Sequence, residues 1–241
     1  MKQLQFTQLA QDVSNCHLCA NMITPPHFTQ PEYLENDDHG LHTDMLYVNR
    51  WNLWQGNLDA DIMVIGQDYG QKESGSDIRL WKIGDDSDPT NHGLRTLFRE
   101  AFSIDIDAGD TPLFFTNMAN CYRKQRTSGG MHAGWLPVCA SRYMARLIRI
   151  VRPKVIIVLG LAAFEAMYCM DGLQVQCKNP VESAPGTLAE IMKYDYRIDL
   201  DGCEIGVFPV YHPGANSKRN RSVEQQVEDW KEIKGYYDRV K

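Results

Sequence analysis

Asp68, Asn117 and His212 are the residues of this sequence whose types could act together on a substrate. A carboxylate such as that of Asp68 can position or deprotonate water and stabilise a neighbouring cation. An imidazole can hydrogen-bond to an oxygen that gains negative charge, and an asparagine amide offers both a donor and an acceptor. Each residue also has a purely structural explanation: an acidic turn, a strand-end cap and a histidine in a loop.

Each of the three follows a short apolar run of the kind that forms a strand buried on both faces of a parallel sheet. The run Ile62–Ile65 ends at Gly66, which allows a sharp turn into Gln67. The carboxyl ends of parallel strands share one edge of the sheet, where ligands bind in open α/β folds. We therefore predict that the three polar residues lie along that edge. The predicted strands are 61–65, 113–116, 155–159 and 206–210.

Stretches with apolar residues at helical spacing separate these strands. The alternation of strands and helices indicates an α/β fold whose parallel sheet is covered on both faces. The polar segment 71–92 is predicted to be an active-site loop, and the aromatic-bearing segment 20–57 an ordered insertion into a single domain, 1–241. The predicted helices are Leu4–Val13, 92–102, 137–151, one that begins at Gly160, and 222–240.

Composition limits the class of protein. With 241 residues, 43% of them hydrophobic, the chain can bury a sizeable core. The formal net charge of −6 argues against a uniformly basic nucleic-acid-binding protein but leaves room for a local basic face. Because no apolar run could span a bilayer and Met1–Gln5 does not resemble a signal peptide, we expect a cytoplasmic protein without a membrane partner.

The seven cysteines are expected to be free, metal-bound or catalytic in that compartment. Cys16-x-x-Cys19 is a common metal or redox pattern, although no strand precedes it as in a thioredoxin-like motif. Cys121 follows the second predicted strand, and Cys139 lies at the start of a helix, where a lone cysteine is commonly a small buried hydrophobe. Four thiolates could hold either zinc or an iron–sulfur cluster, and their spacing does not separate the two.

Several segments form a joint pattern by their order along the chain: Cys16-x-x-Cys19, Gly56–Gly66, Thr116-Asn117-x-x-Asn120-Cys121-Tyr122-Arg123, Cys139, Arg152–Ala163 and Val207–Pro213. Together they resemble the iron–sulfur uracil-DNA glycosylases, often called family 4, within the wider uracil-DNA glycosylase superfamily. The resemblance implies a three-layer α/β/α sandwich with a central four-stranded parallel sheet and a DNA groove at the strands' carboxyl ends.

The resemblance also implies a site and a cofactor. Asn117 matches the asparagine that reads the uracil edge, and His212 matches the histidine that faces the base oxygen. A [4Fe–4S] cluster, with zinc as the alternative occupant, would clamp the N-terminal segment to the region after the second strand. Its ligands by this resemblance are Cys16, Cys19, Cys121 and Cys139.

The first motif departs from family 4. Gln67 stands where that family usually has glutamate, and Gly66-Gln67-Asp68 instead resembles the cluster-free family 1, in which the aspartate is catalytic. Tyr69 follows directly, without the proline that family 1 places before its tyrosine. The aromatic that stacks on the flipped base in family 4 has no counterpart in 84–89. We expect Gly66, Gln67 and Tyr69 to line the substrate pocket, with Tyr69 excluding the methyl group of thymine.

The chemistry of base excision suits the three polar residues. An enzyme that acts on a base in a duplex must take it out of the stack. Breaking the sugar–base bond builds positive charge on the sugar, near Asp68, and negative charge on the leaving base, near His212. The donor and acceptor of Asn117 complement uracil and disfavour cytosine.

Lys218, Arg219 and Arg221 follow His212 closely and are predicted to contact DNA phosphates. A second basic run, Arg123–Arg126, follows Asn117. Such runs are commonly solvated charged loops, but both come after carboxyl ends of strands, where a DNA backbone would cross. The expected partner is DNA that contains a damaged base, bound by a monomer.

Three functions remain open from the sequence. The first is excision of uracil, or of a related deaminated base, from DNA. The second is a catalytically weak or inactive relative that binds nucleic acid through the same groove, an alternative raised by Gln67. The third is a nucleotide-binding or small-molecule α/β enzyme, which is weakened because no Gly-x-Gly-x-x-Gly or P-loop pattern follows a strand.

Overall fold

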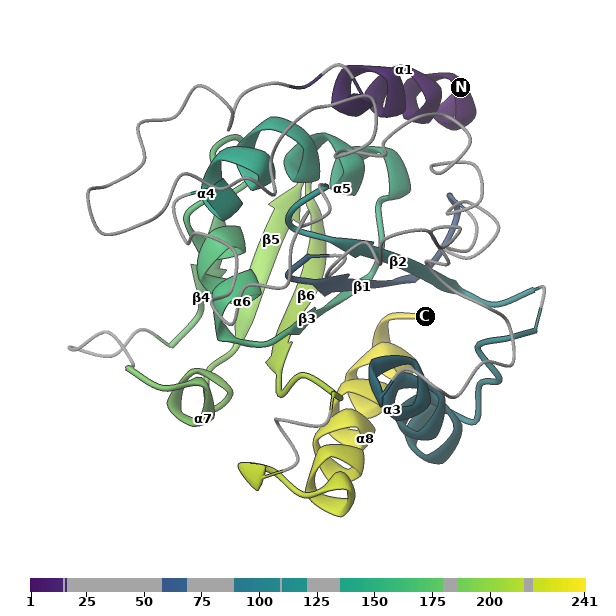
Figure 1. Ribbon diagram of the computed structural model, residues 1–241, viewed down its shortest axis with the longest axis vertical. Coiled ribbons are helices and arrows are strands. Elements are labelled where there is room, and N and C mark those ends of the chain that lie inside the picture. The colour runs from purple at the N-terminus through teal and green to yellow at the C-terminus, as the bar shows by residue number, and fades with distance from the viewer. Residues whose placement is uncertain are drawn as a thin grey trace, which may run out of the picture.

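A computed structural model describes residues 1–14, 16, 58–68, 89–108, 110–120, 135–179, 186–214 and 219–241. Its centre is a six-stranded sheet in the order β2-β1-β3-β6-β5-β4 (Figure 1). The four predicted strands are neighbours and run parallel: β1 (Ile62–Gly66), β2 (Leu113–Asn117), β3 (Val155–Leu159) and β6 (Cys203–Val210). The predicted parallel sheet is therefore confirmed.

Two antiparallel strands, which the sequence analysis did not predict, extend the sheet beyond β6. They are β5 (Tyr196–Leu200) and β4 (Val175–Cys177). β5 and β6 form a hairpin whose turn residues Asp201 and Gly202 both have positive φ, at 54° and 81°. This is the turn geometry that matches the twist of two antiparallel strands, and it is why β6 begins at Cys203, earlier than predicted.

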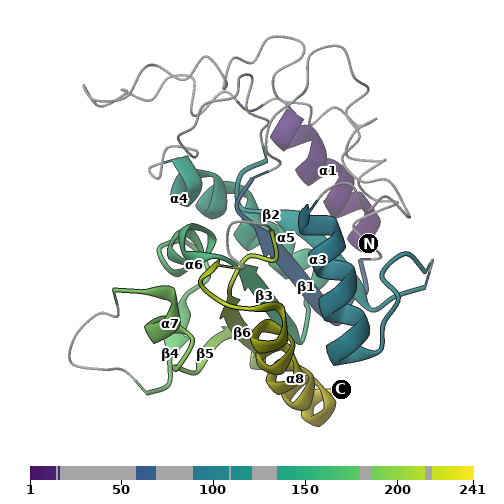
Figure 2. The same ribbon diagram turned by 60° about the horizontal axis from the view of Figure 1, so that its bottom comes forward.

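Helices cover both faces of the sheet, so the predicted three-layer α/β/α sandwich is confirmed (Figures 1 and 2). Successive residues of β1 point to opposite faces: Met63 and Ile65 belong to one hydrophobic cluster, Ile62 and Val64 to the other. The first cluster is completed by α1 (Lys2–Ser14), α4 (Trp135–Cys139), η4 (Ala140–Met144), α5 (Ala145–Val151) and α6 (Leu161–Tyr168). The second is completed by α3 (Pro89–Leu97), η3 (Phe98–Phe102) and α8 (Val223–Val240).

The helices agree with the apolar spacing, with shifted ends. The predicted helix 92–102 begins at Pro89, so the end of the predicted loop 71–92 is helical, as suits a proline in the first turn. The rest of that loop and the predicted insertion 20–57 lie outside the described residues. The predicted helix 137–151 begins at Trp135 and contains the π-helical turn η4. A short helix, α7 (Leu188–Ile191), precedes β5.

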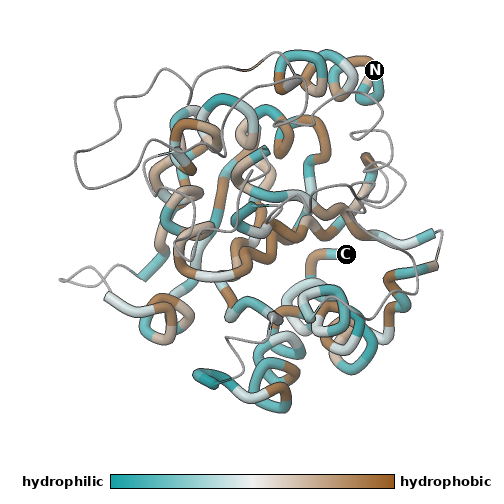
Figure 3. The backbone as a smooth tube through the Cα atoms, in the orientation of Figure 1, coloured by the Kyte–Doolittle hydropathy of each residue, from teal (hydrophilic) through white to brown (hydrophobic). Residues whose placement is uncertain are grey.

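Apolar residues fill the strands and the inward helix faces, while polar residues colour the outer helix faces (Figure 3). α8 shows how one helix is fixed. Ser222 and Gln225 form a capping box at its start, and the buried Trp230 packs edge-on against Phe98 with ring centroids 4.9 Å apart. Within the described part of the chain, no helix is long and apolar enough to cross a membrane.

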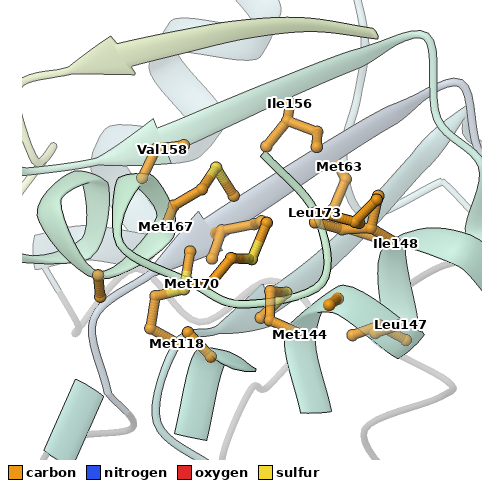
Figure 4. Packing of buried hydrophobic residues seen from close by; sticks show 14 of the residues in the cluster. Met63, Met118, Met144, Leu147, Ile148, Ile156, Val158, Met167, Met170 and Leu173 are labelled. Atoms are coloured by element: carbon orange, nitrogen blue, oxygen red, sulfur yellow. The ribbon is translucent and has the colours of Figure 1, made fainter. Parts of the chain in front are cut away.

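Methionines are concentrated in the layer between the sheet and α4–α6 (Figure 4). Met63, Met118, Met144 and Met167 are almost completely buried there. Met118 follows the last residue of β2 directly, and Met144 lies in η4. This packed layer anchors the backbone immediately after β2, which leads from the sheet edge toward Cys139.

Candidate active site

Asn117 lies against Gly66 at the carboxyl edge of the sheet. The two residues are register partners at the ends of β2 and β1. A Cβ atom added at Gly66 would lie only 2.2 Å from Asn117 Oδ1. The amide of Asn117 therefore occupies the space that any side chain at residue 66 would need.

The turn after β1 is held to the segment after β2 by backbone hydrogen bonds. Met118 N donates to Gly66 O at 2.8 Å, and Ala119 N donates to Gln67 O at 2.9 Å. The Gln67 side chain then donates to Asp68 Oδ2 at 3.3 Å. Gln67 thus orients the half-buried carboxylate of Asp68, a role that glutamate could not fill while both groups are ionised.

His212 reaches the same edge at the end of β6. The backbone N–H of Gly214 donates to His212 Nδ1 at 3.1 Å. A ring nitrogen that accepts a hydrogen bond carries no proton, so the imidazole is neutral with its proton on Nε2. In this tautomer Nε2–H is the donor group of the ring.

The loop that carries His212 rests on α3 and on the turn after β3. A Cβ at Gly93 would lie 2.5 Å from Pro213 O and 2.7 Å from Pro213 Cβ, so α3 approaches the loop as only a glycine permits. Gly160 follows β3 with φ at 91°, and a Cβ there would be 3.9 Å from His212 Cβ. These contacts with α3 and Gly160 position the His212 imidazole at the carboxyl edge of the sheet.

The sheet order places Asp68, Asn117 and His212 along one edge. Asp68 and His212 follow β1 and β6, Asn117 ends β2, and only β3 separates β1 from β6. The carboxyl ends of all four parallel strands point to this edge, as predicted for a ligand site in an α/β sheet. Tyr69, also predicted to line the pocket, lies outside the described residues.

The predicted DNA-contacting arginines differ in their surroundings. Arg221 donates through Nε to Asp229 Oδ2 at 2.8 Å and through Nη2 to Oδ1 of the same carboxylate. This bidentate pair largely neutralises the charge of Arg221 and raises the pKa of its guanidinium. Arg219 is exposed at the start of the same segment, and Lys218 lies outside the described residues.

Cys16 and Cys139 come together from distant parts of the chain. Cys16 follows α1 in a turn in which its N–H donates to Val13 O at 3.1 Å, and it packs against the first hydrophobic cluster. Cys139 ends α4 and is buried. Burial is the main cause that raises the pKa of the Cys139 thiol to about 11, and the nearby Cys16 raises it further.

The sulfur of Cys139 has a hydrogen-bond donor. Asn120 Nδ2 donates to Cys139 Sγ at 3.4 Å. The Tyr143 hydroxyl, one helical turn after Cys139, donates to Asp12 O at 3.4 Å and lies near Cys16. Burial, with Cys16 as a further cause, raises the pKa of the phenol. A donor such as Asn120 stabilises a thiolate that ligates a metal, so the described part of the site fits a thiolate-bound group.

The other two predicted ligands, Cys19 and Cys121, lie outside the described residues. No group of three potential metal ligands occurs among the described ones. Asn120, the last described residue of its segment, contacts Cys139. Sequence reasoning missed Asn120 and Tyr143, and the only available signals were their positions next to Cys121 and four residues after Cys139.

Comparison with known proteins identifies the family. The model of the uracil DNA glycosylase superfamily matches residues 53–234, which is more than half of the chain. The chain belongs to the uracil-DNA glycosylase superfamily. No curated protein matches it.

The residues that match the superfamily model include the whole sheet edge described above. Asp68, Asn117 and His212 all lie within residues 53–234, as do Cys121 and Cys139. Cys16 and Cys19 lie before the match. The superfamily match therefore covers the carboxyl edge of the sheet but only half of the predicted cysteine site.

Proposed function

We propose that this glycosylase-superfamily protein excises uracil, or a related deaminated base, from DNA by hydrolysis of the N-glycosidic bond. The observation that carries the proposal is the sheet edge itself: an oriented carboxylate, an amide and an imidazole lie at the carboxyl ends of three of the four parallel strands in a chain of this superfamily. The substrate is DNA with a base that can be flipped into this edge.

Asn117 would read the base. Its amide can donate to the uracil O4 and accept from N3–H, whereas cytosine offers the opposite pattern at both positions. The contact with Gly66 limits where this amide can lie, so the reading geometry exists before the base enters. Tyr69 would then close the pocket against the C5 position and exclude thymine.

Asp68 and His212 would divide the chemistry. As the bond from C1′ to N1 breaks, its electron pair moves to the base, and the sugar becomes cationic. Asp68 stabilises that cation and accepts a proton from the water whose oxygen bonds to C1′. The Nε2–H of His212 donates to the O2 atom of the leaving uracil anion, and a neutral imidazole can do so without first gaining a proton.

We further propose that Cys16, Cys19, Cys121 and Cys139 hold a [4Fe–4S] cluster, with zinc as the alternative. The convergence of Cys16 and Cys139 and the hydrogen bond from Asn120 to Cys139 support a thiolate-bound group. When bound, the group supplies a structural clamp between the N-terminal segment and the region after β2. Iron and sulfide analysis of anaerobically purified protein separates cluster from zinc.

Phosphate contacts would come from the segment after His212. Arg219 and Lys218 are better suited to this role than Arg221, because Asp229 already holds the Arg221 guanidinium. Binding through such contacts weakens steeply as salt concentration rises.

One assay tests the function. The protein is incubated with single- and double-stranded DNA that contains uracil, hypoxanthine, thymine opposite guanine, or normal bases only. Release of uracil above the other bases supports the proposal. Binding to these DNAs without release of any base would instead support a nucleic-acid-binding protein that lacks activity, which Gln67 in place of the family 4 glutamate makes the second candidate.

A further inference from the structure

Asn120 links the segment after β2 to Cys139 by a hydrogen bond. Its side-chain amide donates to Cys139 Sγ at 3.4 Å, across nineteen positions of the chain. Its backbone continues the segment that begins with Asn117, at the base-binding edge. A single residue thus contacts the cysteine site three positions after the asparagine proposed to read the base.

The segment between Asn117 and Asn120 is held tightly. The N–H groups of Met118 and Ala119 donate to the carbonyls of Gly66 and Gln67, and both side chains are buried in the first hydrophobic cluster. Such a segment has little freedom to bend. A displacement of Asn120 therefore also displaces Asn117, whose side chain lies directly beside Gly66.

We propose that Asn120 is a positioning residue that couples occupancy of the cysteine site to recognition of the base by Asn117. The inference rests on the cofactor and the substrate proposed above. A thiolate that ligates a metal accepts a stronger hydrogen bond than a neutral thiol, because the bond is charge-assisted. Occupancy of the site thus tightens the contact from Asn120 to Cys139 and fixes the segment that carries Asn117.

The coupling must act in both directions. If occupancy of the cysteine site favours binding of uracil, then bound uracil favours retention of the group, by the same factor in equilibrium affinity. Undamaged DNA covers the same surface but gives Asn117 no uracil to hold. The two DNAs are therefore compared by how much each slows loss of the bound group. The difference between them measures the coupling, because a general effect of DNA binding is the same for both.

The test measures loss of iron to a ferrous chelator from anaerobically prepared protein. The measurement is made without DNA, with undamaged DNA, and with the same DNA carrying 2′-fluoro-2′-deoxyuridine. The electron-withdrawing fluorine of this analogue destabilises the sugar cation and prevents cleavage. The variants are Asn120→Ala, Asn120→Asp, which keeps the shape but loses the N–H donor, and Tyr143→Phe. Tyr143→Phe is the matched control, since it removes a hydroxyl that lies near Cys16 and donates to Asp12 O, and it leaves the segment from Asn117 to Asn120 untouched.

We expect uracil-containing DNA to slow iron loss from the unmodified protein several-fold more than undamaged DNA does. Both Asn120 variants should lose iron about 10–100-fold faster, as is typical when a partner of a metal ligand is removed, and should show no difference between the two DNAs. Tyr143→Phe should also lose iron faster, but uracil-containing DNA should still slow that loss more than undamaged DNA does. If Asn120→Ala does not fold, Asn120→Asp tests the coupling instead, because it retains the shape of the side chain.

Two results would overturn the inference: an Asn120 variant that keeps the difference between the DNAs, or a Tyr143→Phe protein that loses it as fully as Asn120→Ala. If the unmodified protein excises uracil but retains neither iron nor zinc, the coupling fails together with the cofactor proposal, while the proposed excision stands. If it retains iron but excises no base, the proposed function fails, and the difference in iron loss between the two DNAs still tests the coupling.

Discussion

Asn117 Oδ1 occupies the position that a side chain at Gly66 would require, since a Cβ there would lie 2.2 Å away. The two residues face each other across the ends of β1 and β2. The glycine that turns the chain toward Asp68 is thus also the residue that leaves room for the Asn117 amide. Gly66 therefore affects both the carboxylate proposed to be catalytic and the amide proposed to read the base.

Gly66→Ala should therefore impair excision more than folding. The added methyl group displaces the end of the Asn117 side chain, and a misplacement of about 1 Å commonly costs on the order of 10²-fold in rate. Single-turnover excision and thermal unfolding are measured together. Gly235→Ala is the matched control: its Cβ meets only the tip of Arg239 at 3.9 Å, so excision should stay unchanged and the helix should gain about 0.5–1 kcal/mol. Equal excision by both variants would contradict the account of Gly66.

The state of the His212 ring can be tested directly. The N–H of Gly214 donates to Nδ1, so nitrogen NMR should show an unprotonated Nδ1 and a protonated Nε2 in the free protein at neutral pH. His212→Ala should lower single-turnover excision by about 10²–10³-fold, with little change in DNA binding, because the lost bond forms mainly to the leaving anion. A ring protonated at Nδ1 would contradict this assignment.

Arg219 and Arg221 should respond differently to substitution. Arg219→Ala should weaken binding to damaged and undamaged DNA alike and reduce the salt slope by about one phosphate contact. Arg221→Ala leaves the mostly buried Asp229 without its bidentate partner and should cost about 1–3 kcal/mol in the free energy of unfolding. Salt-dependent binding and urea unfolding separate the two effects. If Arg221→Ala is as stable as the unmodified protein, the pairing with Asp229 has no structural role.

Most of the fold was predictable because its signals are local. The strands β1, β2, β3 and β6 are short apolar runs with clear ends, and their helices show apolar residues at helical spacing. β5 was missed although Asp201-Gly202 is a typical hairpin turn, since the alternation in Tyr196–Leu200 includes charged residues. β4 has only three residues and exists through its pairing with β5, which no local pattern reveals.

The position of the candidate residues at the strand ends was predictable, but their contacts were not. Asp68, Asn117 and His212 stand at strand ends, where residue type and position are enough to single them out. The bond from Gln67 to Asp68, the closeness of Asn117 to Gly66 and the bond from Asn120 to Cys139 depend on three-dimensional placement. The basic run that contains Arg221 predicted a contact with DNA, but the arginine is paired with Asp229. The run does not reveal this pairing, because Asp229 lies on α8.

Tyr237 should make stability depend on alkaline pH. Burial, together with its hydrogen bond to Asp61 at 3.0 Å, raises the pKa of Tyr237 to about 12, above the value of about 10 in the unfolded chain. The folded state therefore favours the neutral phenol. The stabilisation is full below pH about 10 and is lost as the pH rises toward about 12.

Urea unfolding at several pH values checks this expectation. Tyr237→Phe should lower the free energy of unfolding at neutral pH, through loss of the bond to Asp61, and should flatten its decline at alkaline pH. Part of the decline should remain, because burial also raises the pKa of Tyr196 to about 12. A decline of the same steepness in Tyr237→Phe and in the unmodified protein would show that Tyr237 does not contribute.

The most direct test of the central claim is single-turnover excision of uracil from DNA by the unmodified protein and by Asp68→Asn, at saturating enzyme, with equilibrium binding measured alongside. The unmodified protein should release uracil, and Asp68→Asn should do so about 10²–10³-fold more slowly while binding the same DNA nearly as tightly, because the carboxylate acts on the sugar cation and on water. Equal rates for the two proteins, or no release of uracil by the unmodified protein, would contradict the claim.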